Sequence, residues 1–270
     1  MNVTIITGGS DGIGAEMARQ LAARHKADLA LVLSGRSQDK LDAVAAQCRA
    51  LGSEVLTVAM DVSIEAQCRG LVAQAVQRFG RIDTLVNNAG ISAQANFADV
   101  KAEDLRWYMD LMQVNLWGAV WCTHEALPHL KQARGRIVAV GSLAGLIGVP
   151  GRTAYSATKF AMTGFFEALR AELKPAGVSV TIAYPGAVDT RIRYRGYNAK
   201  GQAAGASGLK EDDLMSVEEC ARLIVEGMEH RQREVVMTAK GKLGRFIKLL
   251  APGVVETMAL KALKEDVRPH

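Results

Sequence analysis

Tyr155 and Lys159 stand one helical turn apart at the start of a helix-forming stretch, so their side chains share one face. A free phenol has a pKa of about 10, which is too high for efficient proton exchange at neutral pH. A neighbouring ammonium favours the phenolate and lowers that pKa. Tyr and Lys also meet by chance on many amphipathic helices, so the spacing alone is weak evidence. Together with the effect of the ammonium, this spacing predicts that the phenol of Tyr155 acts as a general acid and base.

Two further polar residues stand where such a site needs them. Ser142 directly follows an apolar run, Gly135–Gly141. At the carboxyl end of a parallel strand, its hydroxyl would hold a substrate carbonyl while Tyr155 protonates it. Asn115 lies inside the helical stretch Ala102–Leu130, where asparagine is disfavoured. A kinked helix with a structural water explains it, and so does an exposed asparagine.

A glycine-rich turn joins the first apolar run to the first helical stretch. It reads Thr7-Gly8-Gly9-Ser10-Asp11-Gly12-Ile13-Gly14. The glycines at 8, 12 and 14 permit a tight turn and let backbone N–H groups approach a pyrophosphate, and the helix N-terminus adds a partial positive charge. Glycines also serve loop geometry alone, but this position between strand and helix favours a dinucleotide site. Ser10, Asp11 and Ile13 are expected to contact the cofactor with the glycines.

The end of the second apolar run predicts which dinucleotide binds. An acid there would bind the ribose hydroxyls and repel a 2′-phosphate, but this chain reads Leu33-Ser34-Gly35-Arg36-Ser37. The guanidinium of Arg36 can pair with a phosphate and stack on the adenine, which predicts NADP(H) rather than NAD(H). Alternatively, Arg36 is a solvated loop charge. Asp11 argues against this prediction, because a carboxylate that points into the site would weaken phosphate binding.

In order and spacing, these motifs resemble those of the short-chain dehydrogenase/reductase family. The match runs from residue 2 to about 240 and comprises Thr7-Gly8-x-x-x-Gly12-Ile13-Gly14, Asn87-Asn88-Ala89-Gly90, Asn115, Ser142, Tyr155-x-x-x-Lys159 and Pro185-Gly186-x-x-x-Thr190. The resemblance implies a Rossmann-type fold. It also implies a catalytic tetrad formed by Asn115, Ser142, Tyr155 and Lys159, in which Asn115 holds a water that leads protons to Lys159.

The resemblance also implies which residues border the cofactor. Tyr155 and Lys159 would lie at the nicotinamide end, and the remaining contacts are Asp61, Val62, Asn88, Ala89, Gly90, Pro185, Gly186, Val188 and Thr190. The implied activity is hydride transfer between NADP(H) and a carbonyl or alcohol. An NAD-dependent alcohol dehydrogenase and a catalytically silent dinucleotide-binding regulator remain as alternatives.

These residues need a parallel sheet to position them. Strand-like runs are expected at Val3–Thr7, Leu29–Ser34, Glu54–Ala59, Thr84–Val86, Gly135–Gly141, Val178–Tyr184 and Glu234–Thr238. Helices are expected at Gly12–His25, Gln38–Leu51, Ile64–Phe79, Ala102–Leu130, Ala154–Lys174 and Val217–His230. Runs that are apolar on both sides and separated by helices predict an α/β fold: a doubly wound parallel sheet of about seven strands in a three-layer sandwich.

No change of composition divides the 270 residues, which predicts one Rossmann-type catalytic domain over residues 1–240. Residues 187–216 are rich in Gly, Ala and basic residues and lack periodicity, so a substrate lid is expected there. Residues 241–270 alternate basic and apolar residues and predict a C-terminal helical extension. A docked helix or oligomer contact, a flap over the substrate and a membrane-surface helix are all open interpretations of it.

Composition narrows the function further. Hydrophobic residues make up 49% of the chain, enough for a core without metals or disulfides, and the four cysteines lack metal-ligand spacing. Without a signal peptide or a spanning segment, the chain is predicted to be cytoplasmic. The net charge of +5 is dispersed without aromatic interleaving, which argues against nucleic acid as a partner.

The expected partners are therefore a small carbonyl or alcohol and further copies of the chain. The apolar segment Leu143–Val149, with Ala187 and Val188, favours an apolar or lipid-like substrate, although these residues would also suit the core. The family resemblance implies a homodimer or homotetramer through the helices at Ala102–Leu130 and Ala154–Lys174.

Overall fold

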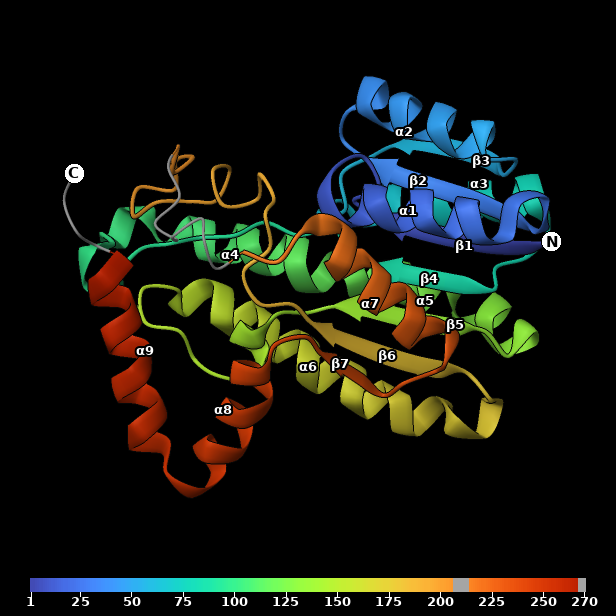
Figure 1. Ribbon diagram of the computed structural model, residues 1–270. Coiled ribbons are helices and arrows are strands. Elements are labelled where there is room, and N and C mark those ends of the chain that lie inside the picture. The colour runs from blue at the N-terminus through green and yellow to red at the C-terminus, as the bar shows by residue number, and fades with distance from the viewer. Residues whose placement is uncertain (206–213, 267–270) are drawn as a thin grey trace.

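The protein is built around a seven-stranded parallel sheet with the strand order β3-β2-β1-β4-β5-β6-β7 (Figure 1). The structure is a computed structural model that describes residues 1–205 and 214–266, without the side chains of residues 262–266. The strands are β1 (Asn2–Thr7), β2 (Leu29–Gly35), β3 (Glu54–Ala59), β4 (Thr84–Asn87), β5 (Arg136–Val140), β6 (Ser179–Tyr184) and β7 (Glu234–Val236). The strand order reverses between β1 and β4, and ligands bind outside the carboxyl ends of strands at such a point.

Helices cover both faces of the sheet because its strands are apolar on both sides. α1 (Gly12–His25), α2 (Gln38–Ala50) and α7 (Val217–Glu229) contribute to one core cluster, while α3 (Glu65–Phe79), α5 (Gly118–Ala133) and α6 (Thr153–Leu173) contribute to the other. Along β1, Val3 and Ile5 face the second cluster and Ile6 faces the first. The predicted three-layer α/β sandwich is confirmed.

The long helix expected at Ala102–Leu130 is instead a series of shorter elements. A 3₁₀ turn at Ala102–Asp104 precedes α4 (Arg106–Met112), and a π-helical turn at Gln113–Trp117 leads into α5. A π turn inserts one extra residue and rotates the side chains that follow it, and such turns are frequent at functional sites. Asn115 lies in this turn and is completely buried.

The segment after β6 crosses the carboxyl ends of the strands. Of the predicted lid, residues 206–213 lie outside the described residues. The described part is held by isolated bridges between Val188 and Met215 and between Ala93 and Tyr197. Its function as a lid stays a prediction.

The C-terminal extension is helical, as α8 (Ala239–Leu250) and α9 (Pro252–Asp266). Figure 1 shows this helical pair at the end of the molecule toward which the strands point. Residues 267–270 of the extension lie outside the described residues. Among the described helices, none combines the length and apolarity needed to span a membrane.

Candidate active site

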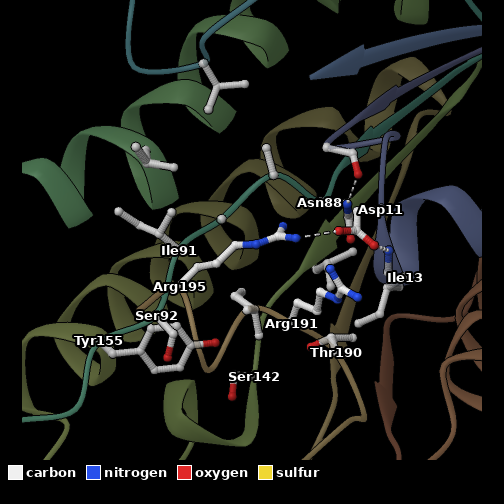
Figure 2. Close-up of a pocket in the computed structure, with 18 of the residues that line it drawn as sticks. Asp11, Ile13, Asn88, Ile91, Ser92, Ser142, Tyr155, Thr190, Arg191 and Arg195 are labelled. Carbon is white, nitrogen blue, oxygen red and sulfur yellow. Dashed lines mark hydrogen bonds and ion pairs between the residues drawn. The ribbon is translucent and has the colours of Figure 1, made fainter. Parts of the chain in front are cut away.

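A cavity of about 620 Å³ lies at the carboxyl ends of the strands, and Figure 2 shows residues that line it. Nearly all of the site residues expected from the sequence line this cavity. They are Gly8, Ser10, Asp11, Gly12, Ile13, Arg36, Asp61, Val62, Asn88, Ala89, Gly90, Ser142, Tyr155, Lys159, Pro185, Gly186, Val188 and Thr190. Gly14 and Asn115 stand behind the wall and support it.

The glycine turn between β1 and α1 is packed as closely as its backbone permits. Gly8 and Gly12 have φ angles of +65° and +53°, which favour glycine. A Cβ on Gly14 would stand 2.4 Å from the Gly8 carbonyl oxygen. Directly after β4, the Asn88 side chain donates a hydrogen bond to the Thr7 carbonyl at 2.9 Å. At Gly8 and Gly12 the turn therefore exposes backbone to the cavity beside the N-terminus of α1.

Asp11 caps α1 and is paired with two cations. Its carboxylate accepts hydrogen bonds from the Gly12 N–H at 2.9 Å and from Arg195 at 3.0 Å, and it lies 3.6 Å from Lys40 Nζ. Burial acts to raise the pKa of Asp11, but the hydrogen bonds from Arg195 and Gly12 outweigh it and hold the pKa below its usual value. Figure 2 shows Arg195 reaching across the cavity to this carboxylate, so the negative charge of the turn is paired.

Arg36 lines the cavity directly after β2. Its side chain is exposed and makes no hydrogen bond or ion pair with another described residue. The strand end carries no acid that would repel a ribose phosphate. This guanidinium is therefore available to an anion from the solvent side.

Tyr155 and Lys159 lie on the first turns of α6, with only 9% and 4% of their surfaces exposed. The Lys159 ammonium donates a hydrogen bond to the Val140 carbonyl at 2.9 Å and lies 5.7 Å from the centre of the Tyr155 ring. Burial lowers the pKa of Lys159, and the phenol of Tyr155 partly offsets this. The expected pairing of phenol and ammonium on one helix face is present.

Asn115 is fixed by three hydrogen bonds behind the cavity. Its side-chain oxygen accepts from the Ile91 N–H at 2.8 Å, and its amide donates to the Ile91 carbonyl and the Thr158 hydroxyl, each at 3.0 Å. A Cβ on Gly90 would lie 3.1 Å from the Asn115 oxygen and 3.8 Å from Lys159 Nζ. Asn115 thus links the end of β4 to α6, and the exposed-asparagine interpretation is wrong.

Ser142 begins a 3₁₀ turn at Leu143–Gly145, directly after β5. Its hydroxyl accepts a hydrogen bond from the Ala144 N–H at 3.2 Å, which caps the turn. None of residues 143–149 is among those that line the cavity. Leu143 and Leu146 pack against the core instead, so this apolar segment does not supply the expected apolar wall.

Sequence reasoning missed Arg152, which stands beside the phenol. Its guanidinium donates to the Ser92 hydroxyl at 3.1 Å and lies 5.3 Å from the centre of the Tyr155 ring. The spacing of three residues before Tyr155 was available as a signal, because residues three apart share a helix face. The approach of Arg195 to Asp11 had no such signal, since the two residues are far apart in the chain.

Comparison with known proteins agrees with this geometry. A family model described as short chain dehydrogenase matches residues 2–200. The chain belongs to the short-chain dehydrogenase family. This confirms the resemblance drawn from the motifs and establishes the family as that of a nicotinamide-dependent oxidoreductase.

Two relatives and one solved structure illustrate the similarity. The chain is 40% identical to an 11-beta-hydroxysteroid dehydrogenase-like protein 4A of Arabidopsis thaliana, over 84% of this chain and 73% of that protein. It is 30% identical to a dehydrogenase/reductase SDR family protein 7-like of Dictyostelium discoideum, over 98% and 83%. The structure of an alcohol dehydrogenase from the archaeon Thermococcus sibiricus, complexed with 5-hydroxy-NADP, superposes with a TM-score of 0.73 at 27% identity and covers 87% of this chain and 94% of that one.

The buried ammonium leads to a prediction about stability. Because burial places the folded-state pKa of Lys159 below its usual value of 10.5, the unfolded state binds more protons between the two values. The contribution of Lys159 to stability therefore rises with pH as pH climbs toward 10.5, by about 1.4 kcal/mol per unit of pKa difference. In Lys159→Met we expect that rise to be missing. Urea unfolding of both proteins from pH 7 upward would measure the difference, and parallel curves would contradict it.

Proposed function

We propose that the protein reduces a carbonyl compound with NADPH, and that Tyr155 supplies the proton. The observation that carries this proposal is the burial of Tyr155 beside the Lys159 ammonium, in a cavity that also contains Ser142 and a glycine cradle. A dinucleotide fits this cradle, because the close packing of Gly8 and Gly14 leaves backbone N–H groups and the start of α1 to meet a pyrophosphate. When bound, NADPH would supply a hydride to the substrate's carbonyl carbon.

Four side chains have separate roles in the proposed proton transfer and substrate binding. The Ser142 hydroxyl binds the carbonyl oxygen and orients it toward the phenol. Tyr155 donates its proton to that oxygen as negative charge develops there. Lys159 contributes positive charge beside the phenol and binds the ribose next to the nicotinamide. Asn115 fixes the backbone of Ile91 near Lys159 and holds the water through which protons return to it.

Loss of the phenol hydroxyl tests this assignment. We expect Tyr155→Phe to lower kcat by at least about 10²-fold, which is the usual size of a general-acid contribution. NADPH affinity should stay within about twofold, because the glycine cradle and Arg36 are untouched. Stopped-flow and steady-state absorbance at 340 nm would give kcat, and nucleotide fluorescence would give affinity. A Phe variant with near-normal turnover would remove Tyr155 from the mechanism.

Arg36 is proposed to select NADPH by pairing with the 2′-phosphate. Support comes from its guanidinium, which lines the cavity and pairs with no other described residue, and from the pairing of Asp11 with Arg195 and Lys40. We expect wild-type protein to bind NADPH at least about tenfold more tightly than NADH, a difference of about 1.4 kcal/mol. Arg36→Gln should remove most of this preference by weakening NADPH alone.

The control for this prediction is Arg106→Gln, since Arg106 is exposed and does not line the cavity. It should leave both affinities unchanged. Equal or tighter binding of NADH by the wild-type protein would overturn the cofactor assignment. It would favour the alternative of an NAD-dependent alcohol dehydrogenase.

The proposed substrate is an apolar or lipid-like ketone or aldehyde. Apolar residues that line the cavity include Ile91, Val114, Ala187 and Val188. Relatives named hydroxysteroid dehydrogenase also point to a polycyclic apolar substrate class. An 11-ketosteroid and long-chain aliphatic ketones are therefore the first probes. A catalytically silent regulator would bind NADPH and reduce none of them.

We further propose that the protein is cytoplasmic and assembles as a homodimer or homotetramer through the region of α4 to α6. Trp117 and Phe160 support this, because they are large apolar residues of that region with 45% and 37% of their surfaces exposed.

The outer face of the C-terminal helices is proposed to contact a membrane surface. Leu249 and Leu250 are 78% and 89% exposed, and the exposed Lys242 and Lys261 lie on the same two helices. Exposed apolar residues beside basic ones are typical of helices that lie in the interface of anionic bilayers.

A double variant, Leu249→Gln with Leu250→Gln, tests the membrane contact. We expect wild-type protein to sediment with phosphatidylcholine vesicles that contain phosphatidylserine, and the double variant to sediment several-fold less, because about 0.8 kcal/mol is lost per unburied methylene. Leu51→Gln, which alters an exposed leucine after α2, should behave as wild type. Absence of wild-type protein from the pellet would contradict the proposal.

A further inference from the structure

The turn that carries Ser142 is held from two sides. On one side it contacts α6: a Cβ on Gly145 would stand 2.7 Å from the Lys159 carbonyl oxygen, and the Thr163 hydroxyl donates to the Gly145 carbonyl at 3.3 Å. The first turn residue, Leu143, donates its N–H to the Pro185 carbonyl at 3.0 Å. These contacts join the turn to the helix that carries Tyr155 and to the end of β6.

Helix α8 closes the other side of the same turn through two glycines. A Cβ on Gly241 would meet Leu143 Cδ2 at 2.4 Å, and a Cβ on Gly244 would meet Ile147 Cδ1 at 2.9 Å. Residues three apart share one helix face, so this face of α8 lacks side chains where the turn approaches it. A side chain on Gly241 would have to displace the end of the Leu143 side chain and would crowd the Thr238 hydroxyl.

Lys248 extends the same contact by one helical turn. Its ammonium donates a hydrogen bond to the Leu146 carbonyl at 2.8 Å and lies 4.7 Å from the centre of the Phe160 ring. The helix itself is anchored independently, because Arg245 pairs with Glu234 and the Thr238 hydroxyl caps the Gly241 N–H at 2.9 Å. Helix α8 therefore has anchors besides the turn that it contacts.

Leu143 connects this contact to the reacting centre. It lies between α8 and the end of β6, since a Cβ on Gly186 would stand 3.6 Å from its Cδ1. Gly186 lines the cavity, as does Ser142, which directly precedes Leu143. Because Leu143 directly follows Ser142, a shift of the Leu143 backbone would move Ser142 relative to Tyr155.

We propose that α8 is a positioning element of the active site: Gly241, Gly244 and Lys248 hold the Ser142 turn against α6 at the position where Ser142 meets the substrate carbonyl. The proposal rests on the carbonyl-reductase function above and extends it to the C-terminal helices. These three residues touch neither the cofactor cradle nor the reacting atoms. Their effect is therefore on turnover, through Ser142, and not on NADPH affinity.

Gly241→Ala is the first test, with Gly253→Ala as its matched control. Alanine favours a helix over glycine. A Cβ on Gly241 would also stand 2.9 Å from the Thr238 hydroxyl that caps α8, so circular dichroism of both variants checks that helix content is kept. A Cβ on Gly253 meets nothing within 4 Å, whereas one on Gly241 displaces Leu143. We expect Gly241→Ala to lower kcat about tenfold or more with NADPH affinity within about twofold, and Gly253→Ala to match the wild type.

Lys248→Met is the second test, because it keeps an unbranched side chain only one atom shorter and removes the donor to Leu146. A loss of kcat of about tenfold is expected, as for one hydrogen bond from a charged donor. Lys248→Arg should restore most of it, because a guanidinium can also donate to that carbonyl. The control is Lys131→Met, at an exposed lysine of α5 that does not line the cavity, which should retain wild-type kcat and KM.

Hydrogen exchange of the turn gives a readout that needs no substrate. The amides of Gly145, Leu146 and Ile147 are hydrogen-bonded within the turn. In Gly241→Ala and Lys248→Met, peptides that cover residues 143–147 should exchange at least several-fold faster, and peptides of the glycine turn should not change. Unchanged exchange in both variants would show that α8 does not hold the turn.

Failure of the proposed function and failure of the positioning proposal give different results. If the wild-type protein binds NADPH and reduces none of the ketone probes, the proposed function fails and the positioning proposal fails with it, whatever the exchange data show. If the wild type reduces a ketone and both variants keep its kcat, only the positioning proposal is overturned. Faster exchange with lower kcat and unchanged NADPH affinity is the expected result.

Discussion

The buried ammonium of Lys159 constrains the whole centre of the molecule. A charge in the interior has to be met by hydrogen-bond acceptors, because desolvation otherwise costs several kcal/mol. Here the acceptor is the carbonyl of Val140, the last residue of β5, and Asn115 stands nearby behind Gly90. The start of α6, the end of β5 and the end of β4 must therefore converge at one point. For the stability of the fold alone, a Leu or Met would suit this buried position better than a lysine.

The π-helical turn is the local departure from a regular helix that this convergence requires. A regular helix from α4 into α5 would present side chains at fixed angles, whereas the extra residue of the turn directs the Asn115 side chain into the protein. There all three of its hydrogen bonds are made to Ile91 and Thr158. A buried amide that is fully bonded defines one arrangement, since any shift would leave polar groups unpaired. The turn thus fixes the end of β4 relative to α6.

The sequence predicted the sheet and the residues around the cavity because both are encoded locally. The strand end at Ser142, the glycine turn before α1 and the helix-face spacing of Tyr155 and Lys159 each involve neighbouring residues. The π turn was not predicted, since Gln113–Trp117 has the composition of an ordinary helix. The pairing of Arg195 with Asp11 and the packing of Leu143 against α8 join segments that are distant in the chain, and no periodicity reports such contacts.

The two ends of the cavity differ in the same way: one is formed by local backbone, and the other depends on contacts between distant segments. The cradle at Gly8 and Gly14 is formed by backbone that approaches backbone, so its shape depends little on the identity of distant side chains. The Ser142 turn, in contrast, takes its position from α6 on one side and from α8 on the other. Helix α8 lies beyond residue 200, where the match to the family model ends. Under the positioning proposal, changes in this helix would alter how Ser142 holds a substrate carbonyl, while the cradle at Gly8 and Gly14 keeps its geometry.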